Sequence, residues 1–168
     1  MRYFATRDEL IASLDRGLII AELGVFKGDF SEVILRNAEP ALLYLVDTFN
    51  GVVECGDKDG LNVQYCDITD EFQRLTDKYK QEAVVVKKCT TREFLQSTLV
   101  EAVYIDANHS FDSVYEDLCL SYYAGCRLFM CHDYNLQSVS LAVKQFCYEH
   151  KLKIQAMTRD LCPTVLIR

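Results

Sequence analysis

The chain shows two alternating patterns of apolar residues: short continuous runs and longer segments with helical spacing. The continuous runs are typical of strands buried on both faces of a sheet. They cover residues 18–23, 41–46, 83–86, 102–105 and 127–131. After each run comes a segment whose apolar residues recur every three or four positions, which predicts a helix. These segments cover residues 29–37, 68–81, 91–98, 110–124 and 139–150.

The two ends of the chain add a helix and a pair of strands. Residues 6–16 predict a helix in which Thr6 is the N-cap and Glu9 completes a capping box. Residues 152–157 and 164–167 predict two strands with no helix between them, so we expect an antiparallel hairpin.

This order of elements predicts an α/β fold with a Rossmann-like sheet. We expect seven strands, mostly parallel, with an antiparallel edge hairpin and helices on both faces. Sheets of this kind bind ligands outside the carboxyl ends of their strands. Residues 48–67 break the alternation with polar, glycine-containing stretches and predict a long loop.

Length and composition indicate one folded domain that spans residues 1–168. Half of the residues are hydrophobic, and no repeat, low-complexity segment or linker divides the chain. No apolar run approaches the roughly 18–20 residues that a membrane span needs, and the first residues lack the apolar core of a signal peptide. We therefore expect a cytoplasmic protein without a membrane partner.

The net charge of −7 bears on the choice of partner. Nucleic acids and anionic membranes are bound by clustered Lys and Arg residues, which this chain lacks, so we expect no nucleic-acid partner. The eight cysteines include no C-x-x-C pair and no zinc-finger spacing, which predicts reduced thiols. Cys55 and Cys66 flank the polar loop and are the one pair that we consider for a disulfide.

The first predicted strand ends in the segment ELGVFKG at residues 22–28. Gly24 and Gly28 have no Cβ, so a ligand can lie against the backbone where the next helix begins. The spacing differs from the G-x-G-x-x-G dinucleotide fingerprint. It resembles E/D-x-G-x-x-x-G, the first motif of class I methyltransferases that use S-adenosylmethionine (SAM). A tight turn without any ligand would need the same two glycines.

Two more polar residues follow strands at this edge of the sheet. Asp47 ends the second strand, where a carboxylate can accept hydrogen bonds from both hydroxyls of a ribose. A nicotinamide cofactor also presents a ribose, so the spacing of Gly24 and Gly28 is what favours SAM. Thr91 follows the third strand, in a loop that borders the adenine in methyltransferases, but it is equally suited to cap the next helix.

Two carboxylates and two imidazoles follow the fourth and fifth strands. Asp106 and His109 come after one strand, and His132 and Asp133 come after the next. Because adjacent strands lie about 5 Å apart, Asp106 and Asp133 can share one ion, and oxygen ligands suit Mg²⁺. A single aspartate there often caps a helix, and a single histidine often fills a core. Four such residues at adjacent strand ends favour a functional site.

The segments DANHSF at 106–111 and HDY at 132–134 resemble the D-x-x-H-x-[YF] and H-D-Y patterns of the small methyltransferase-24 family, which includes macrocin-type sugar O-methyltransferases. The resemblance covers about residues 18–150 and implies the class I methyltransferase sheet. It implies that SAM is held by Glu22, Gly24, Gly28, Ser31, Asp47, Thr91 and Asp106. It also implies a metal site formed by Asp106, His132 and Asp133.

The chain departs from this family at one position. D-G-D-H is common in the family where this chain has Asp106-Ala107-Asn108-His109. The amide of Asn108 cannot accept a proton in place of a carboxylate. We therefore expect His109 or His132 to be the general base, unless a metal-bound acceptor oxygen ionises without one.

The sequence thus predicts SAM-dependent, Mg²⁺-assisted O-methylation of a small hydroxylated acceptor, such as a sugar or a natural product. A SAM- or nucleotide-binding module without catalysis stays open, because Asn108 replaces an acid. An NAD-linked oxidoreductase is disfavoured by the missing fingerprint. A nucleic-acid methyltransferase is disfavoured by the absence of a [DNS]-P-P-[YFW] motif and by the acidic charge. The content of Tyr and Phe permits a homodimer.

Overall fold

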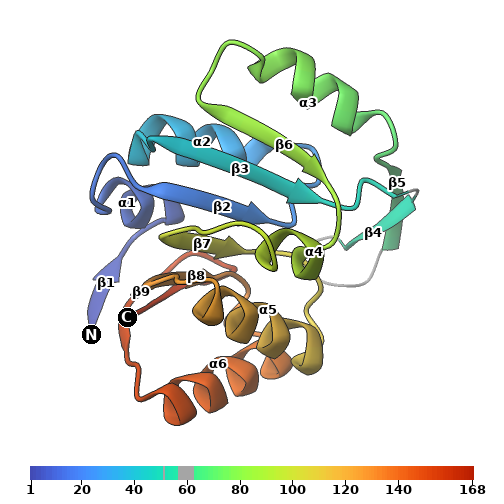
Figure 1. Cartoon of the computed structure of the whole chain (residues 1–168). Helices are drawn as coiled ribbons and strands as arrows, with labels where there is room; N and C mark the ends of the chain where they lie inside the picture. The colour runs from blue at the N-terminus through green and yellow to red at the C-terminus, as the bar shows by residue number, and fades with distance from the viewer. Residues whose placement is uncertain (51, 57–62) are drawn as a thin grey trace.

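The architecture is a twisted, mostly parallel sheet with helices on both faces (Figure 1). The computed structural model describes residues 1–50, 52–56 and 63–168. The strands of the main sheet are β1 (Arg2–Phe4), β2 (Ile19–Leu23), β3 (Leu42–Asp47), β6 (Val84–Lys88), β7 (Ala102–Ile105), β8 (Leu128–Cys131), β9 (Ile154–Thr158) and β10 (Val165–Ile167). The helices are α1 (Arg7–Ala12), α2 (Asp29–Ala38), α3 (Glu71–Tyr79), α4 (Thr91–Leu95), α5 (Phe111–Tyr123) and α6 (Gln137–His150).

The strands lie in the order β1-β9-β10-β8-β7-β2-β3-β6. The central strands β8, β7, β2, β3 and β6 run parallel to one another, and β10 runs antiparallel to both of its neighbours. The alternation of strands and helices read from the apolar pattern is therefore confirmed, together with the antiparallel hairpin of β9 and β10.

The two faces of the sheet carry separate apolar cores. Helices α1, α2 and α3 cover one face, and α4, α5 and α6 cover the other (Figure 1). Successive residues of β7 alternate between the two cores: Val103 packs toward α5 and α6, and the fully buried Tyr104 packs toward α1 and α2. No helix in the described part of the chain has the length and apolar character needed to cross a membrane.

The sheet has one strand more than the seven predicted. β1 pairs in parallel with β9, with Arg2 opposite Ala156 and Phe4 opposite Thr158. It covers three residues, of which only Phe4 is buried, so the sequence around it has no alternation that predicts a strand. Because β1 lies outside β9, the hairpin is next to the edge of the sheet and not at it.

The segment predicted as one long loop contains a small antiparallel hairpin. Its strands are β4 (Val52–Gly56) and β5 (Val63–Asp67), and they pair with each other apart from the main sheet. Its register sets Cys66 opposite Val53 and Cys55 opposite Gln64, so the two cysteines do not face each other across the hairpin. The side chain of Cys55 lies outside the described residues, and Cys66, Cys89, Cys119, Cys126, Cys131, Cys147 and Cys162 are free thiols.

Helix α1 is shorter than the predicted segment 6–16. Thr6 is its N-cap, as expected, and its hydroxyl accepts a hydrogen bond from the backbone N–H of Glu9 at 3.3 Å. The Glu9 carboxylate accepts from the N–H of Ala5 at 2.8 Å and not from that of Thr6, so the predicted capping box does not form. The cap sets the start of α1, and with it the place of Arg7 in the first turn.

The ladder of backbone hydrogen bonds continues one residue past the carboxyl ends of four central strands. The N–H of Gly24 donates to the carbonyl of Val46 at 2.9 Å, and the N–H of Asp106 donates to the end of β2 at 2.9 Å. The N–H of His132 donates to the end of β7 at 3.1 Å. These bonds fix three of the predicted site residues in register at one edge of the sheet.

We predict that Gly24→Ala destabilises the fold far more than Gly17→Ala. Both glycines have positive φ, +88° and +76°, where a Cβ costs about 1–2 kcal/mol. At Gly24 a Cβ would also lie 2.3 Å from the carbonyl oxygen of Asp106, whereas at Gly17 it would meet no atom within 4 Å. Urea unfolding should show a loss beyond about 2 kcal/mol for Gly24→Ala only. Equal losses in the two variants would contradict the close approach of β2 and β7.

Candidate functional site

A cavity of about 590 Å³ opens at the carboxyl ends of β2, β3, β6 and β7. This volume lies within the range of about 300–1,000 Å³ that is common for small-molecule sites. Five of the predicted residues line it: Gly24, Asp47, Thr91, Asp106 and His109. The cavity is also lined by Phe26, Ile68 and Cys89, which were not predicted as site residues. Their apolar side chains carry no signal that separates them from the core.

The turn after β2 forms the floor of the cavity. At Gly24 the backbone passes so close to the end of β7 that a Cβ would lie 2.3 Å from the Asp106 carbonyl oxygen and 2.7 Å from the Ala107 Cα. The turn then reaches Phe26, a non-glycine residue with φ of +53°. The missing Cβ of Gly24 thus makes room for the chain after β7, and Gly24 also lines the cavity.

Gly28 is needed for packing and not for contact with the cavity. It is the N-cap of α2 in the left-handed conformation, with φ of +76°. A Cβ there would lie 2.6 Å from Cδ2 of Leu75 in α3. Gly28 does not line the cavity, so its predicted role in holding SAM is indirect: it lets α2 begin at the turn.

Glu22 and Ser31 form a buried pair beneath the turn. Each side chain is 1% exposed, and the Ser31 hydroxyl donates to Oε2 of Glu22 at 2.5 Å. Burial raises the pKa of Glu22 to about 8, although the bond from Ser31 opposes this shift. Neither residue lines the cavity. The pair supports the turn from below, and the carboxyl group of Glu22 is protonated at neutral pH.

Asp47 organises the same turn from the side. Its Oδ2 accepts hydrogen bonds from the N–H groups of Val25 at 2.8 Å and Phe26 at 3.0 Å. Its Oδ1 accepts from the N–H of Phe49 at 3.0 Å. The carboxylate lines the cavity, and Oδ1, which accepts one hydrogen bond, has a second lone pair for a ligand hydroxyl.

The structure separates the two roles considered for Thr91. Thr90 is the N-cap of α4 and forms a capping box with Glu93, through bonds of 2.9 and 3.2 Å. Thr91 is thus free of the cap, and it lines the cavity. Asp117 is buried in α5, and burial raises the pKa of this acid to about 7, against a smaller opposing effect of Thr91.

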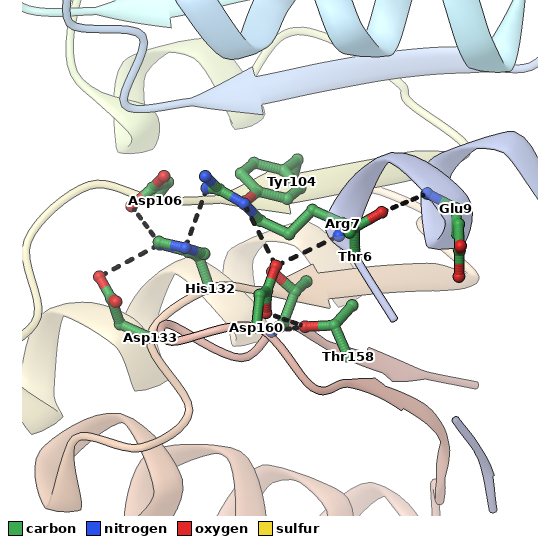
Figure 2. Close-up of polar contacts among 10 residues, drawn as sticks. Thr6, Arg7, Glu9, Tyr104, Asp106, His132, Asp133, Thr158 and Asp160 are labelled. Carbon is green, nitrogen blue, oxygen red and sulfur yellow. Dashed lines mark hydrogen bonds and ion pairs between the residues drawn. The ribbon is translucent and has the colours of Figure 1, made fainter. Parts of the chain in front are cut away.

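The four polar residues after β7 and β8 converge on one spot. The Nδ1 atom of His132 lies 3.1 Å from Oδ1 of Asp106 and 3.1 Å from Oδ2 of Asp133 (Figure 2). The Nε2 atom of His109 lies 2.9 Å from the same oxygen of Asp133 and 3.5 Å from that of Asp106. The expected meeting of two carboxylates and two imidazoles is therefore observed.

The backbone around this cluster is held in place by local bonds. Asp133 adopts the left-handed conformation, with φ of +53°, which an aspartate tolerates better than most residues. The Ser138 hydroxyl donates to the carbonyl of His109 at 2.6 Å. The side-chain oxygen of Asn108 accepts from the N–H of Ser110 at 2.8 Å, so Asn108 shapes the turn into α5 and takes no part in the cluster.

The carboxylates and imidazoles shift the pKa values of one another. Hydrogen bonds to Asp106 and Asp133 raise the pKa of His109 to about 9, against a smaller opposing effect of burial. For His132 burial is the largest effect and lowers the pKa, but the same two carboxylates outweigh it and raise the pKa to about 9. The two histidines hold the pKa of Asp133 below its ordinary value despite burial.

Arg7 joins this cluster from helix α1, far away in the sequence. One of its terminal nitrogens lies 2.9 Å from Nε2 of His132 (Figure 2). A guanidinium only donates hydrogen bonds, so it opposes protonation of this nitrogen. Arg7 was not among the predicted site residues, because nothing in the sequence near residue 7 indicates that the first turn of α1 reaches the ends of β7 and β8.

The residues of the cluster do not fit Mg²⁺ as they stand. Mg²⁺ prefers an octahedral set of oxygens and keeps several waters. Here each carboxylate oxygen that faces the centre lies within 3.5 Å of an imidazole nitrogen. Both ring nitrogens of His132 are engaged, one by carboxylates and the other by Arg7. The reaction proposed for this site therefore uses no metal ion.

The sequence matches no protein-family model and no curated protein, but solved structures share the fold. TrmK from M. capricolum in complex with S-adenosylhomocysteine (SAH) has a TM-score of 0.63 and 14% identity over 98% of this chain and 67% of its own. The ribosomal protein L11 methylase from Lactobacillus delbrueckii subsp. bulgaricus has a TM-score of 0.65 and 9% identity over 96% and 75%. The B. subtilis tRNA methyltransferase TrmK has a TM-score of 0.61 and 10% identity over 98% and 65%.

These similarities show that the chain has the fold of the class I SAM-dependent methyltransferases. They also contradict the prediction of a small-molecule acceptor with no nucleic-acid partner, since tRNA methyltransferases are among the matched structures. That prediction used the net charge of −7, which is a sum over the whole chain. Binding depends on the local distribution of charge, so the sum does not exclude nucleic acid.

We predict that Glu22→Gln makes the fold less sensitive to rising pH. The folded protein keeps the proton of Glu22 up to about pH 8, whereas the unfolded chain releases it near the ordinary pKa of about 4.3. The wild type therefore loses stability as pH rises between these values, by at most about 1.4 kcal/mol per pH unit. The glutamine keeps an acceptor for Ser31 and cannot ionise.

Urea unfolding of both proteins at several pH values in this window checks the prediction. The stability of Glu22→Gln relative to wild type should increase with pH. Glu32→Gln is the control: hydrogen bonds from Lys78 and Tyr79 lower the pKa of Glu32, so its effect on stability changes only below about pH 4.3 and should stay constant in this window. Parallel pH dependences for wild type and Glu22→Gln would show that Glu22 is ionised in the folded state.

Proposed function

We propose that this protein binds SAM in the cavity and transfers its methyl group to an acceptor beside His109. The observation that carries the proposal is the bare backbone at Gly24, which faces Asp106 across the floor of a cavity at the carboxyl edge of a class I methyltransferase fold. Ligands of doubly wound sheets bind at this edge. SAM also fits the volume and the mixed apolar and polar lining.

The lining residues can hold the parts of SAM in a definite order. Asp47 offers the remaining lone pair of its Oδ1 to a ribose hydroxyl, and Thr91 with Ile68 borders the space for the adenine. The turn at Gly24 receives the chain that links ribose and sulfonium, and Asp106 offers a negative charge to the methionyl end. Glu22, Gly28 and Ser31 act beneath the turn by keeping its shape.

The reaction requires an in-line approach of the acceptor and removal of its proton. SAM supplies an electrophilic methyl group, whose bond to sulfur breaks as the bond to the acceptor forms, and sulfur keeps the electron pair. His109 lines the cavity and can take the acceptor proton on its ring. Asp106 and Asp133 stabilise the imidazolium that results.

The acceptor atom and the acceptor class are open to experiment. A base at His109 serves an oxygen or a nitrogen nucleophile equally, so the geometry does not single out O-methylation. The matched structures include tRNA methyltransferases and a ribosomal protein methylase, which makes unmodified tRNA transcripts and ribosomal proteins the first acceptors to test. A binding module without catalysis would bind SAM and release no methyl group to any of them.

We predict that Ala107→Leu weakens SAM binding at least about tenfold, because the added methyl groups occupy the cavity that Ala107 lines. Ala41→Leu is the matched control, since Ala41 is exposed and lies outside the lining. Isothermal titration of the three proteins with SAM measures the effect. Absence of SAM binding to the wild type, or equal affinities for the two variants, would overturn the proposed site.

We predict that the rate of methyl transfer increases with pH up to the pKa of His109 in the SAM complex, which lies below about 9. A general base works in its neutral form, and the carboxylates raise the pKa of His109 to about 9. The positive sulfonium of bound SAM should lower this pKa, because it enters the cavity that His109 lines. NMR titration of the histidine rings with and without SAM measures the shift, with His150 as the internal reference outside the lining. A pKa of His109 that SAM leaves unchanged would contradict this assignment.

A further inference from the structure

The guanidinium of Arg7 is fixed from several sides. It lies over the ring of Phe30, 4.8 Å from the ring centre, and donates to the hydroxyl of Tyr104 at 3.3 Å. The backbone N–H of Arg7 donates to Oδ2 of Asp160 at 3.2 Å, and its Nε lies 3.8 Å from the same oxygen. These contacts aim a terminal nitrogen at Nε2 of His132, 2.9 Å away (Figure 2).

Asp160 ties this arrangement to the far hairpin of the sheet. It lies in the turn between β9 and β10, and its Oδ1 accepts a hydrogen bond from the hydroxyl of Thr158 at 2.5 Å. Arg7 thus connects three segments that are distant in the sequence: the start of α1, the ends of β7 and β8, and the β9–β10 turn (Figure 2). A guanidinium held this way loses little further freedom when it bonds a histidine.

The contact with Arg7 determines where His132 carries its proton. A guanidinium has five donors and no acceptor, so Nε2 of His132 has to present a lone pair. The proton of the neutral ring is then on Nδ1, which faces Oδ1 of Asp106 and Oδ2 of Asp133 at 3.1 Å each. One tautomer satisfies all three contacts. The two carboxylates favour a charged ring. A charged ring would, however, set two donors and two positive charges face to face at 2.9 Å, so the contact with Arg7 favours the neutral ring.

We propose that Arg7 is a positioning residue of the methyl-transfer site: it holds His132 as the neutral Nδ1–H tautomer, so that His132 orients Asp106 and Asp133 and cannot take the acceptor proton. The statement about the tautomer is independent of the proposed function, and the statement about methyl transfer rests on it. The two histidines that the sequence could not tell apart then have different tasks.

The surroundings of the two rings support this division. His132 is 8% exposed and does not line the cavity, whereas His109 lines it. The groups that the described residues place at Nε2 of His109 are the two carboxylates, and none of the contacts given for this nitrogen is with a cation. The charged and titratable groups around His132 come from α1, β7, β8 and the β9–β10 turn: Arg7, Tyr104, Asp106, Asp133, Asp160 and Cys162. Arg7 is the cation among them that contacts the ring.

The tautomer is measured directly by long-range ¹H–¹⁵N NMR spectra of the histidine rings, with signals assigned by His109→Gln and His150→Gln. In the wild type we expect His132 to show a protonated Nδ1 and an unprotonated Nε2 near neutral pH. Arg7→Met removes the donors and keeps a long apolar chain. In this variant Nε2 of His132 should become protonated. Arg7→Lys keeps a cationic group that only donates hydrogen bonds and should restore the wild-type pattern. Arg16→Met, at an exposed arginine, is the control and should change nothing.

The effect of Arg7 on methyl transfer is measured with an acceptor, among the tRNA transcripts and ribosomal proteins, that the wild-type protein methylates. Arg7→Met should lower kcat for methyl transfer about 10- to 100-fold while SAM affinity changes little, because Arg7 does not line the cavity. Arg7→Lys should recover part of the rate. A wild-type His132 with a protonated Nε2, or an Arg7→Met variant with an unchanged ring, overturns the proposal. If the protein binds no SAM, the proposed function fails, and the NMR result still decides the role of Arg7.

Discussion

The site depends on backbone hydrogen bonds that continue the parallel sheet one residue past its strands. They pair Gly24 with the end of β3, Asp106 with the end of β2, and His132 with the end of β7, each at 2.9–3.1 Å. Only a glycine fits at the first of these positions, because the chain after β7 passes where a Cβ would be. The same register therefore creates the floor of the cavity and brings the polar cluster to its wall.

The charges at this edge are arranged so that each has a partner. Asp106 and Asp133 face two imidazoles, Arg7 pairs with Asp160, and the fully buried Glu22 stays neutral beneath the turn. A buried carboxylate without a cation would be costly, and protonation avoids that cost. The cluster thus holds negative charge where a sulfonium would arrive, and it has one histidine at the cavity and one behind it.

The sequence predicts those parts of the fold that local patterns encode. Continuous apolar runs identify the central strands, and the polar residues that end them mark the site, because parallel strands share one edge. It misses β1 and the β4–β5 hairpin, which are short and gain their order from pairing and not from periodicity. It also misses Arg7, whose partners are 97 to 153 residues away in the chain. A contact of that kind leaves no trace in the local sequence, and the net charge of the chain does not identify the acceptor.

The most direct test of this account is a crystal structure of the protein with SAH. The account predicts adenosine in the cavity with its ribose on Asp47, and the sulfur above Gly24 on the side of Asp106 and His109. The Arg7–His132 contact should persist behind it. SAH bound elsewhere, or bound with its sulfur turned away from His109, would contradict the central claim that one register of four strands builds both the cofactor cavity and the reacting groups.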